Sequence, residues 1–207
     1  MAQYGFYFNG PRCTGCKTCT LACKDYKDLS CDLALRSVME YAGGAWFTDE
    51  TTGLLGNDVF AYYVTVSCNH CDEPACVAAC PQSALLKDPE TGLVTCDREL
   101  CIGCGTCAAA CPYGAPRVDA EAGKSVKCDG CADRVAQGLA PVCVEACPLR
   151  ALEFGEIEEL RAKYGDTAGI APLPDPALTG PNLVITAPAH AKPCGDTAGA
   201  LANAREL

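Results

Sequence analysis

CIGCGTCAAACP, residues 101–112, places four cysteines at intervals of three, three and four residues and ends in proline. CTGCKTCTLAC, residues 13–23, repeats this spacing. CNHCDEPACVAAC, residues 68–80, and CDGCADRVAQGLAPVCVEAC, residues 128–147, keep the opening CxxC and the closing CxxxC but lengthen the middle gap. One cysteine pattern therefore recurs four times along the chain, as an internal repeat.

The spacing indicates the chemistry of these cysteines. Pro81, Pro112 and Pro148 follow the last cysteine of groups two, three and four, whereas Lys24 stands at that place in group one. CxxCxxCxxxCP is the run with which bacterial ferredoxins bind 4Fe-4S clusters, and its fourth cysteine ligates the neighbouring cluster of a pair. The sixteen grouped cysteines therefore predict four 4Fe-4S clusters.

Nesting along the chain predicts which cysteines share a cluster. The segment between groups two and three has the pattern of a strand, a PETG turn and a second strand, so these groups are expected to form one two-cluster module. Groups one and four must then pair across the sequence. The predicted ligand sets are Cys68, Cys71, Cys76 and Cys111; Cys80, Cys101, Cys104 and Cys107; Cys13, Cys16, Cys19 and Cys147; and Cys23, Cys128, Cys131 and Cys143.

These pairings predict an α+β fold built from two ferredoxin-like 4Fe-4S modules. The outer module is discontinuous, with residues 1–58 and 119–164, and the inner module comprises residues 59–118. Residues 165–207 begin with a stretch that holds six prolines and little regular periodicity, which predicts an extended C-terminal arm. We expect this arm to dock on a partner subunit and to be dispensable for the clusters; a disordered tail is the alternative.

Composition excludes several other classes of protein. Nineteen cysteines would suit a disulfide-stapled secreted protein, but the first residues lack the pattern of a secretory signal, and cysteines three apart do not suit disulfide geometry throughout. No apolar run reaches the eighteen residues of a membrane span. The net charge of −10 argues against a nucleic-acid partner, because phosphate binding needs a basic surface.

The sequence offers no catalytic residues. His70 and His190 are the two histidines, neither lies in a recognisable catalytic motif, and no phosphate loop, dinucleotide fingerprint or serine elbow is present. Electron transfer is therefore the expected chemistry, with an iron–sulfur sensor, a structural zinc protein and a self-contained reductase as alternatives. Cys31, Cys96 and Cys194 lie outside the groups and are interpreted as incidental or buried thiols.

Basic residues gather around groups one and four. Positive charge near a cluster stabilises its reduced form, so the outer clusters are expected to be less reducing than the inner pair, although ordinary solvated side chains are the alternative. The residues concerned are Arg12, Lys17, Lys24, Lys27, Lys124, Lys127 and Arg134.

Several motifs between the cysteines are also informative: YGFYFNGPRCTGCKTCTLACKDYKDL at 4–29, DVFAYYVTVSCNHCDEPAC at 58–76, ACPYGAP at 110–116, KCDGCADRVAQG at 127–138 and GDTAGALAN at 195–203. With these motifs the protein closely resembles, from its first residues to its last, the iron–sulfur subunits of dimethyl sulfoxide reductase-like molybdopterin oxidoreductases. The resemblance implies the same sixteen ligands and the same crossed pairing. Because Cys104 stands where the nitrate reductase branch has tryptophan, it also implies that all four clusters are 4Fe-4S.

The resemblance further implies a non-catalytic electron-transfer subunit of an anaerobic respiratory reductase. Its partners would be a catalytic subunit carrying molybdenum bis-pterin guanine dinucleotide and a separate integral membrane anchor that oxidises quinol. The expected location is peripheral, on the outer, periplasmic face of the cytoplasmic membrane, after co-export with a partner that carries a twin-arginine signal; a cytoplasmic complex is the alternative. Reductive dehydroxylases and polysulfide or tetrathionate reductases share this architecture, so the terminal substrate stays open.

Overall fold

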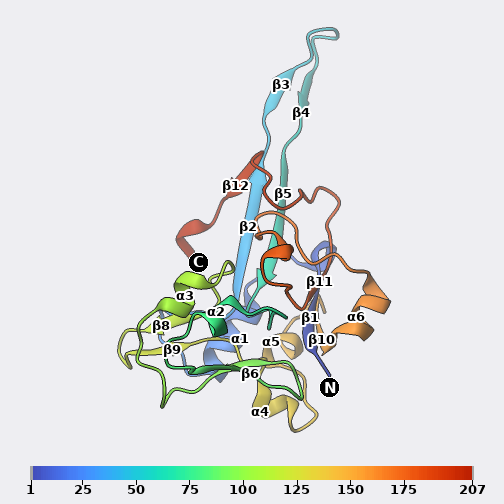
Figure 1. Cartoon of the computed structure of the whole chain (residues 1–207). Helices are drawn as coiled ribbons and strands as arrows, with labels where there is room; N and C mark the ends of the chain where they lie inside the picture. Colours follow the sequence, from blue (N-terminus) through green and yellow to red (C-terminus); the bar gives the residue numbers. More distant parts are fainter. Residues whose placement is uncertain (1, 207) are drawn as a thin grey trace.

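A computed structural model describes residues 2–206 of the 207-residue protein. The helices are short, and most of them begin inside a cysteine group (Figure 1). They are α1 (Thr18–Tyr26), α2 (Ala75–Ala78), α3 (Thr106–Ala110), α4 (Ala132–Val135), α5 (Val142–Glu145) and α6 (Ile157–Tyr164), with 3-10 turns at Gly10–Arg12, Pro176–Leu178 and Ala204–Glu206.

The strands form two three-stranded sheets and three hairpins. The sheets have the orders β10-β1-β11 and β12-β2-β5, and the hairpins are β3-β4, β6-β7 and β8-β9. The strands are β1 (Tyr4–Asn9), β2 (Ser37–Gly43), β3 (Trp46–Thr48), β4 (Leu55–Asn57), β5 (Phe60–Val66), β6 (Leu85–Lys87), β7 (Val94–Cys96), β8 (Arg117–Asp119), β9 (Lys124–Val126), β10 (Leu152–Glu156), β11 (Leu183–Thr186) and β12 (Gly199–Leu201).

Strand β1 joins segments that lie far apart in the sequence. It pairs antiparallel with β10 and parallel with β11, and its four middle residues are all buried. Phe6 and Phe8 point into the main core, while Tyr7 packs with Ile157 of α6 and Val184 of β11 in a separate small cluster. A strand that is covered on both faces has consecutive apolar residues in its sequence. This explains the aromatic residues of β1.

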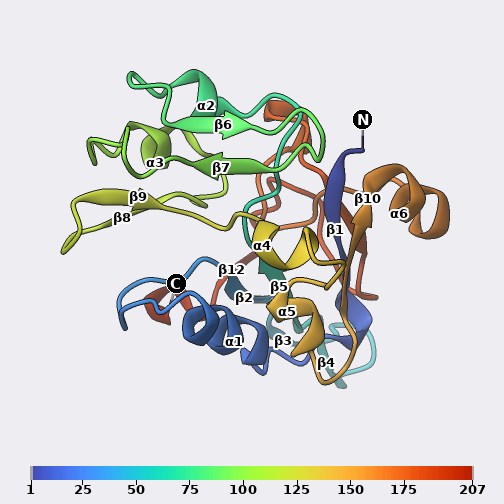
Figure 2. The ribbon, with the colours of Figure 1, turned by 90° about the horizontal axis from the view of Figure 1, so that it is seen from below.

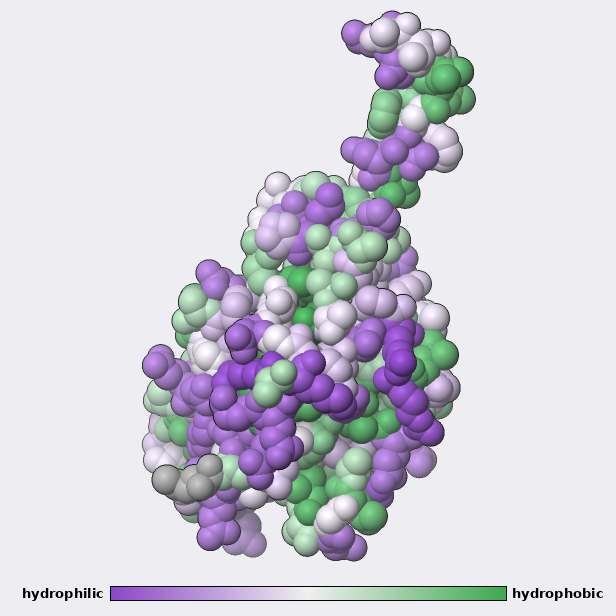
Figure 3. Space-filling model, turned by 90° about the vertical axis from the view of Figure 1, so that its right-hand side faces the viewer, coloured by the Kyte–Doolittle hydropathy of each residue, from purple (hydrophilic) through white to green (hydrophobic). Residues whose placement is uncertain are grey.

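The β2-β5 pair forms the longest ladder and crosses the predicted module boundary at residues 58 and 59. Beyond it, the chain continues into the β3-β4 hairpin, which projects away from the rest of the molecule (Figures 1 and 3). Val64 and Val66 of β5 lie in the same buried cluster as Phe6 and Phe8. Strand β5, assigned from the sequence to the inner module, therefore belongs by its packing to the core that also supports the outer cysteine groups.

The predicted hairpin between groups two and three is present as β6-β7. Its turn is held by Asp88, which accepts hydrogen bonds from the Glu90 amide at 3.0 Å and the Thr91 hydroxyl at 2.5 Å. The β6-β7 and β8-β9 hairpins lie one above the other beside α2 and α3, as the view from below shows (Figure 2). The mixed helices and strands agree with the predicted α+β class.

The C-terminal segment differs from the predicted arm. It is irregular over most of its length, but Leu183–Thr186 forms β11 in the central sheet, and β12 extends the edge of β2. Residues Leu183, Val184 and Ile185 are at most 3% exposed. The segment therefore lies across the protein's own core. The apolar strand β11 pairs with the edge of β1 that β10 leaves open, and this pairing buries its side chains.

Candidate iron–sulfur sites

The structure brings each predicted set of four cysteines together. Cys68, Cys71, Cys76 and Cys111 line one cavity whose other walls include Pro74, Pro112 and Tyr113. Two of these cysteines are buried and two are half-buried. Helices α2 and α3 carry Cys76 and Cys107 and lie in contact, so each helix points its following cysteine, Cys80 or Cys111, toward the other loop.

Two further sets line cavities of their own. Cys80, Cys101, Cys104 and Cys107 line one of them, and Cys13, Cys16, Cys19 and Cys147 line the other. Cys104 and Cys16 are exposed, whereas the first and third cysteines of these loops are more enclosed. Each of these two sites therefore approaches the molecular surface at one corner.

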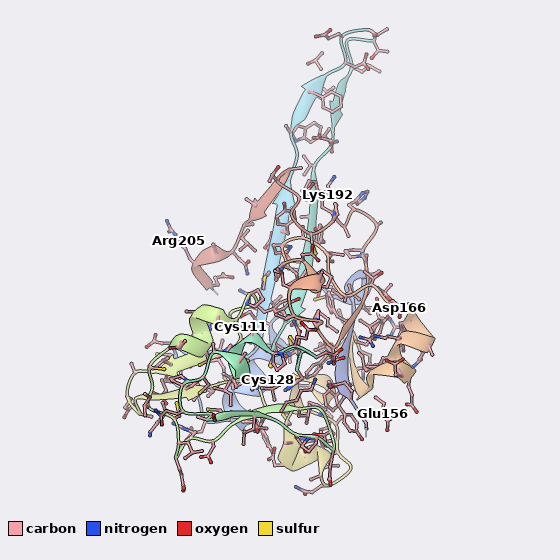
Figure 4. All side chains as sticks on the ribbon, in the orientation of Figure 1. Cys111, Cys128, Glu156, Asp166, Lys192 and Arg205 are labelled. Carbon is pink, nitrogen blue, oxygen red and sulfur yellow. The ribbon has the colours of Figure 1, made fainter. Side chains whose placement is uncertain are left out.

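The fourth set consists of Cys23, Cys128, Cys131 and Cys143. Burial raises the pKa of Cys23 to about 12, and the nearby thiols of Cys128, Cys143 and Cys131 contribute to this rise. All four are buried, and helices α1 and α5, which carry Cys23 and Cys143, pack together. Cysteines more than a hundred residues apart thus lie together, and that they bind one cluster stays a prediction. Figure 4 labels Cys128 and the neighbouring set's Cys111 in the lower half of the molecule.

Backbone amides point at the cysteine sulfurs in a repeated geometry. The amide two residues after the first cysteine of a group donates to that cysteine's Sγ: His70 to Cys68, Gly103 to Cys101 and Gly130 to Cys128, each at 3.4 Å. These donors have positive φ angles between 46° and 71°. Amide donors to sulfur favour the thiolate, which is the form that binds metal.

The cysteines after α2 and α5 have an equivalent arrangement. Ala84 donates its amide to Cys80, and Ala151 donates to Cys147, both at 3.3 Å. Thr179, from the C-terminal segment, donates its hydroxyl to Cys71 at 3.3 Å. In groups two and four, the fourth cysteine therefore also receives a backbone hydrogen bond.

The donor set fits an iron–sulfur cluster. Three of the four sites offer four thiols around a cavity, and burial raises the pKa of Cys76 to about 12 and that of Cys71 to about 11. Buried thiols of this kind lose their protons when a metal group takes them as ligands.

His70 lies fully buried between two of the sites. Its Nδ1 accepts the Val94 amide at 2.8 Å, and burial lowers the pKa of the imidazole. The neutral ring therefore carries its proton on Nε2, which has no oxygen or nitrogen partner among the described residues. This ring lowers the pKa of Cys128 against the opposing effect of burial.

The three ungrouped cysteines occupy different places. Cys31 is exposed, and Cys194 donates its thiol to the carbonyl of Pro174 at 3.4 Å. Cys96 is half-buried beside Cys101; burial raises the pKa of Cys96 to about 11, while its hydrogen bond helps to lower the pKa of Cys101. Cys96 thus stays a thiol next to a predicted ligand, a contact that the sequence does not reveal.

The basic residues predicted near groups one and four fall into two kinds. Lys17, Lys27 and Arg134 form ion pairs with Glu206, Asp129 and Glu145. Lys127 is 7% exposed and has no carboxylate partner among residues 2–206. Arg36 is a second buried cation. The sequence pattern does not indicate its role, because it stands alone before β2, outside the cysteine groups.

Comparison with known proteins agrees with this geometry. Residues 59–157 match a family described as a 4Fe-4S dicluster domain, and residues 11–27 match a 4Fe-4S binding domain. The sequence is 55% identical over 205 residues to the B subunit of anaerobic dimethyl sulfoxide reductase from Escherichia coli K12, covering 99% of this protein and 98% of that one. The protein belongs to the family of dimethyl sulfoxide reductase B subunits.

Other relatives extend the family. The probable anaerobic dimethyl sulfoxide reductase subunit YnfG of the same organism is 56% identical over 99% of this protein and 98% of its own length. The thiosulfate reductase electron transfer subunit PhsB of Salmonella typhi is 38% identical over 76% of this protein and 78% of its own length. As a member of the B-subunit family, the protein is an iron–sulfur protein that binds 4Fe-4S clusters. No helix within residues 2–206 combines the length and hydropathy needed to span a bilayer.

Proposed function

We propose that this protein carries four 4Fe-4S clusters in the four cysteine sets and conducts electrons through an anaerobic reductase resembling dimethyl sulfoxide reductase. The observation that carries the proposal is the gathering of sixteen cysteines into four sets of four in a member of the B-subunit family. A cluster bound at each set accepts and releases one electron, and the protein's own part is to hold the ligands and exclude water.

The arrangement of the sets supports a linear order of clusters. The set with Cys68 neighbours the set with Cys128, since Cys68 acts on the pKa of Cys128. The set with Cys128 and Cys143 neighbours the set with Cys19 in the same way. The set with Cys104 lies beyond the set with Cys68, across the α2-α3 contact. The two exposed ligands, Cys16 and Cys104, then belong to the terminal clusters, where electrons enter and leave.

The proposed partners are a molybdopterin catalytic subunit, which would hold molybdenum bis-pterin guanine dinucleotide, and an integral membrane subunit that oxidises quinol. Relatives named as subunits or electron transfer subunits of reductases support a complex of this kind. The proposed location is the outer face of the cytoplasmic membrane, peripheral to it. A reductive dehydroxylase or a thiosulfate, polysulfide or tetrathionate reductase is the second candidate, favoured by the similarity to PhsB.

The β3-β4 hairpin is the proposed contact with a partner subunit. Its side chains Trp46 and Leu55 are 70% and 76% exposed, and Phe47 and Leu54 are exposed as well. Figure 3 shows hydrophobic atoms on the surface of this projecting hairpin. An isolated two-stranded hairpin is marginally stable in water, so a covering surface would stabilise it. Exposed positions of residues 165–207, among them Leu178 and the outer side of β12, supply further proposed contact surface for a partner, as first expected of the arm.

The test is anaerobic purification of the intact complex with metal analysis of this subunit. We expect about 16 irons and equal sulfide per subunit, from four cubanes, and a molybdenum-containing partner whose turnover identifies the substrate. Cys104→Ser should reduce the iron content and alter one paramagnetic signal, whereas Cys31→Ser, at an exposed cysteine outside the sets, should leave both unchanged. Bound zinc, or equal effects of the two substitutions, would refute the ligand assignment.

The hairpin is tested in the same preparation. A variant lacking residues 46–57 should retain its iron, because the hairpin side chains are exposed and lie outside the buried clusters. It should no longer purify with its partner. Retention of the partner at wild-type yield would remove the hairpin from the interface.

A further inference from the structure

Arg36 is a buried cation with an unusual set of neighbours. It is 2% exposed, and its Nη1 and Nη2 donate to the hydroxyls of Thr65 at 3.2 Å and Ser67 at 2.9 Å. Its guanidinium lies 4.7 Å from the centre of the Phe6 ring. Within residues 2–206 it forms no ion pair with a carboxylate, and its Nε has no hydrogen-bond partner.

A buried charge without a counter-charge is strongly destabilising, so an anion must compensate it. A guanidinium keeps its charge in proteins. The groups around Arg36 that can compensate this charge are cysteines of two sets, which become thiolates when they bind a cluster: Cys143, Cys19, Cys128 and Cys23. The counter-charge of Arg36 is therefore supplied by the two predicted cluster sites that flank it.

Thr65 connects Arg36 to one of these sites. Its hydroxyl oxygen accepts from Arg36, which leaves its own proton free to point at Cys19 Sγ, 3.7 Å away. Thr65 is itself 2% exposed, and no charged side chain other than Arg36 bonds to it among the described residues. Thr65 therefore links Arg36 by hydrogen bonds to Cys19, which belongs to the set that also holds Cys13, Cys16 and Cys147.

Lys127 occupies the same kind of position one step further along the row of sites. Its Nζ donates to the carbonyls of Val94 and Cys128, the latter at 2.6 Å. Cys68 and Cys76 of one set and Cys128 of another lie around this ammonium group. Lys127 thus lies between the sets of Cys68 and Cys128, as Arg36 lies between the sets of Cys128 and Cys19.

We propose that Arg36 and Lys127 are fixed counter-charges placed between successive clusters, each shared by two of them, and that they raise the reduction potentials of the clusters they separate. Reduction adds one negative charge to a cluster, which a neighbouring cation stabilises. The cluster in the set with Cys128 would have both Arg36 and Lys127 as neighbours. The cluster in the set with Cys104 would have neither. This inference rests on the proposed ligation of the four sets.

The test is a redox titration followed by paramagnetic resonance on the assembled complex, with each signal assigned through a Cys→Ser variant in its set. Arg36→Gln should lower the reduction potential of each of the two clusters held by Cys19 and Cys143 by about 59 mV. For one electron, this shift is about a tenfold change in the reduction equilibrium constant. It should leave the cluster at Cys104 unchanged. Arg36→Lys, which keeps the charge, should restore most of the shift.

Two further variants keep the test independent of whether Arg36→Gln assembles. Lys127→Gln should lower the potentials of the clusters at Cys68 and Cys128 instead. Thr65→Val keeps the shape of the side chain but removes the hydroxyl, and should lower only the potential of the cluster at Cys19. Arg161→Gln, in a surface pair with Glu158, is the matched control and should change no potential.

Two results would overturn the inference. In the first, Arg36→Gln, Lys127→Gln and Thr65→Val bind their iron and keep wild-type reduction potentials. In the second, each variant shifts the reduction potentials of all four clusters equally. That outcome leaves the proposed function standing. A wild-type protein with far fewer than about 16 irons would instead refute the proposed ligation itself.

Discussion

At the scale of single residues, the cysteine loops depend on backbone geometry as much as on sulfur. The third position of each CxxC adopts a positive φ angle: Gly15, His70, Gly103 and Gly130 stand there. In three of the four groups the amide of this residue points at the first cysteine. Glycine adopts the conformation without steric cost, whereas His70 adopts it in a fully buried position fixed by Val94.

Gly103→Ala should damage the site that holds Cys101. A β-carbon at this position would overlap the backbone carbonyl of Gly123, in addition to the cost of about 1–2 kcal/mol for a left-handed alanine. We expect a lower melting temperature and iron content reduced by about one cluster in four, measured by calorimetry and iron analysis.

Gly138→Ala is the matched control for this substitution. Gly138 has a similar positive φ of 74°, but a β-carbon there meets nothing within 4 Å. It should show only the backbone cost and keep all its iron. Equal iron loss in both variants would mean that the contact with Gly123 is unimportant.

At the scale of secondary-structure elements, the strands decide which cysteine groups meet. Strand β1 precedes group one, β10 follows group four, and their antiparallel pairing brings the two groups together. The β2-β5 ladder and the parallel strand β11 complete the surroundings of the sites. Helices of four residues such as α2 and α5 cannot form alone, so packing and ligation must hold them.

A variant ending at residue 165 should fail to retain its clusters. It lacks β11, the Thr179 bond to Cys71 and the bond of 2.9 Å from Asn182 to the His70 carbonyl. This reverses the sequence-based expectation that the C-terminal segment is dispensable for the clusters. Visible absorbance and iron content of the anaerobically purified variant provide the measurement.

A variant ending at residue 197 serves as the control truncation. It loses β12 and the turn Ala204–Glu206 but keeps β11 and the contacts with Cys71 and His70. We expect near-normal iron content. Full cluster retention by both truncated variants would show that β11 does not support the sites.

At the scale of the whole molecule, the apolar core and the cluster sites are not separate. The largest buried cluster joins Phe8, Val64 and Ile185 with cysteines from several sets, including Cys19 and Cys128. Arg36 and Lys127 lie buried within the same region. Removing the clusters would therefore leave cavities and uncompensated positive charges at the centre of the molecule.

Anaerobic removal of iron by a chelator should consequently unfold most of the protein. We expect loss of far-ultraviolet circular dichroism together with visible absorbance, since metal binding supplies folding free energy in proteins of this kind. Trypsin should newly cleave after Lys87, whose Nζ donates to the Cys71 carbonyl at 2.8 Å in the folded protein. An iron-free protein that keeps its circular dichroism and resists trypsin at Lys87 would contradict this coupling.

Local spacing predicted much of this protein. The cysteine runs predicted the 4Fe-4S chemistry and the sets that come together in the structure, because the reach of a tight loop and a following helix is fixed within a few residues. The strand and PETG turn pattern between groups two and three predicted the β6-β7 hairpin. The residue run LVIT at 183–186 carried a strand signal as well, although the surrounding prolines obscured it.

Long-range packing decided the rest. The sequence alone determined the family and the 4Fe-4S chemistry and predicted the ligand sets, since ligand spacing is a local property. Only the tertiary structure showed that β11 completes the central sheet, that β5 joins the core of the outer sites and that Arg36 lies between two cysteine sets. Those contacts join residues far apart in the sequence, and their energy depends on burial and on nearby charge, which no local pattern records.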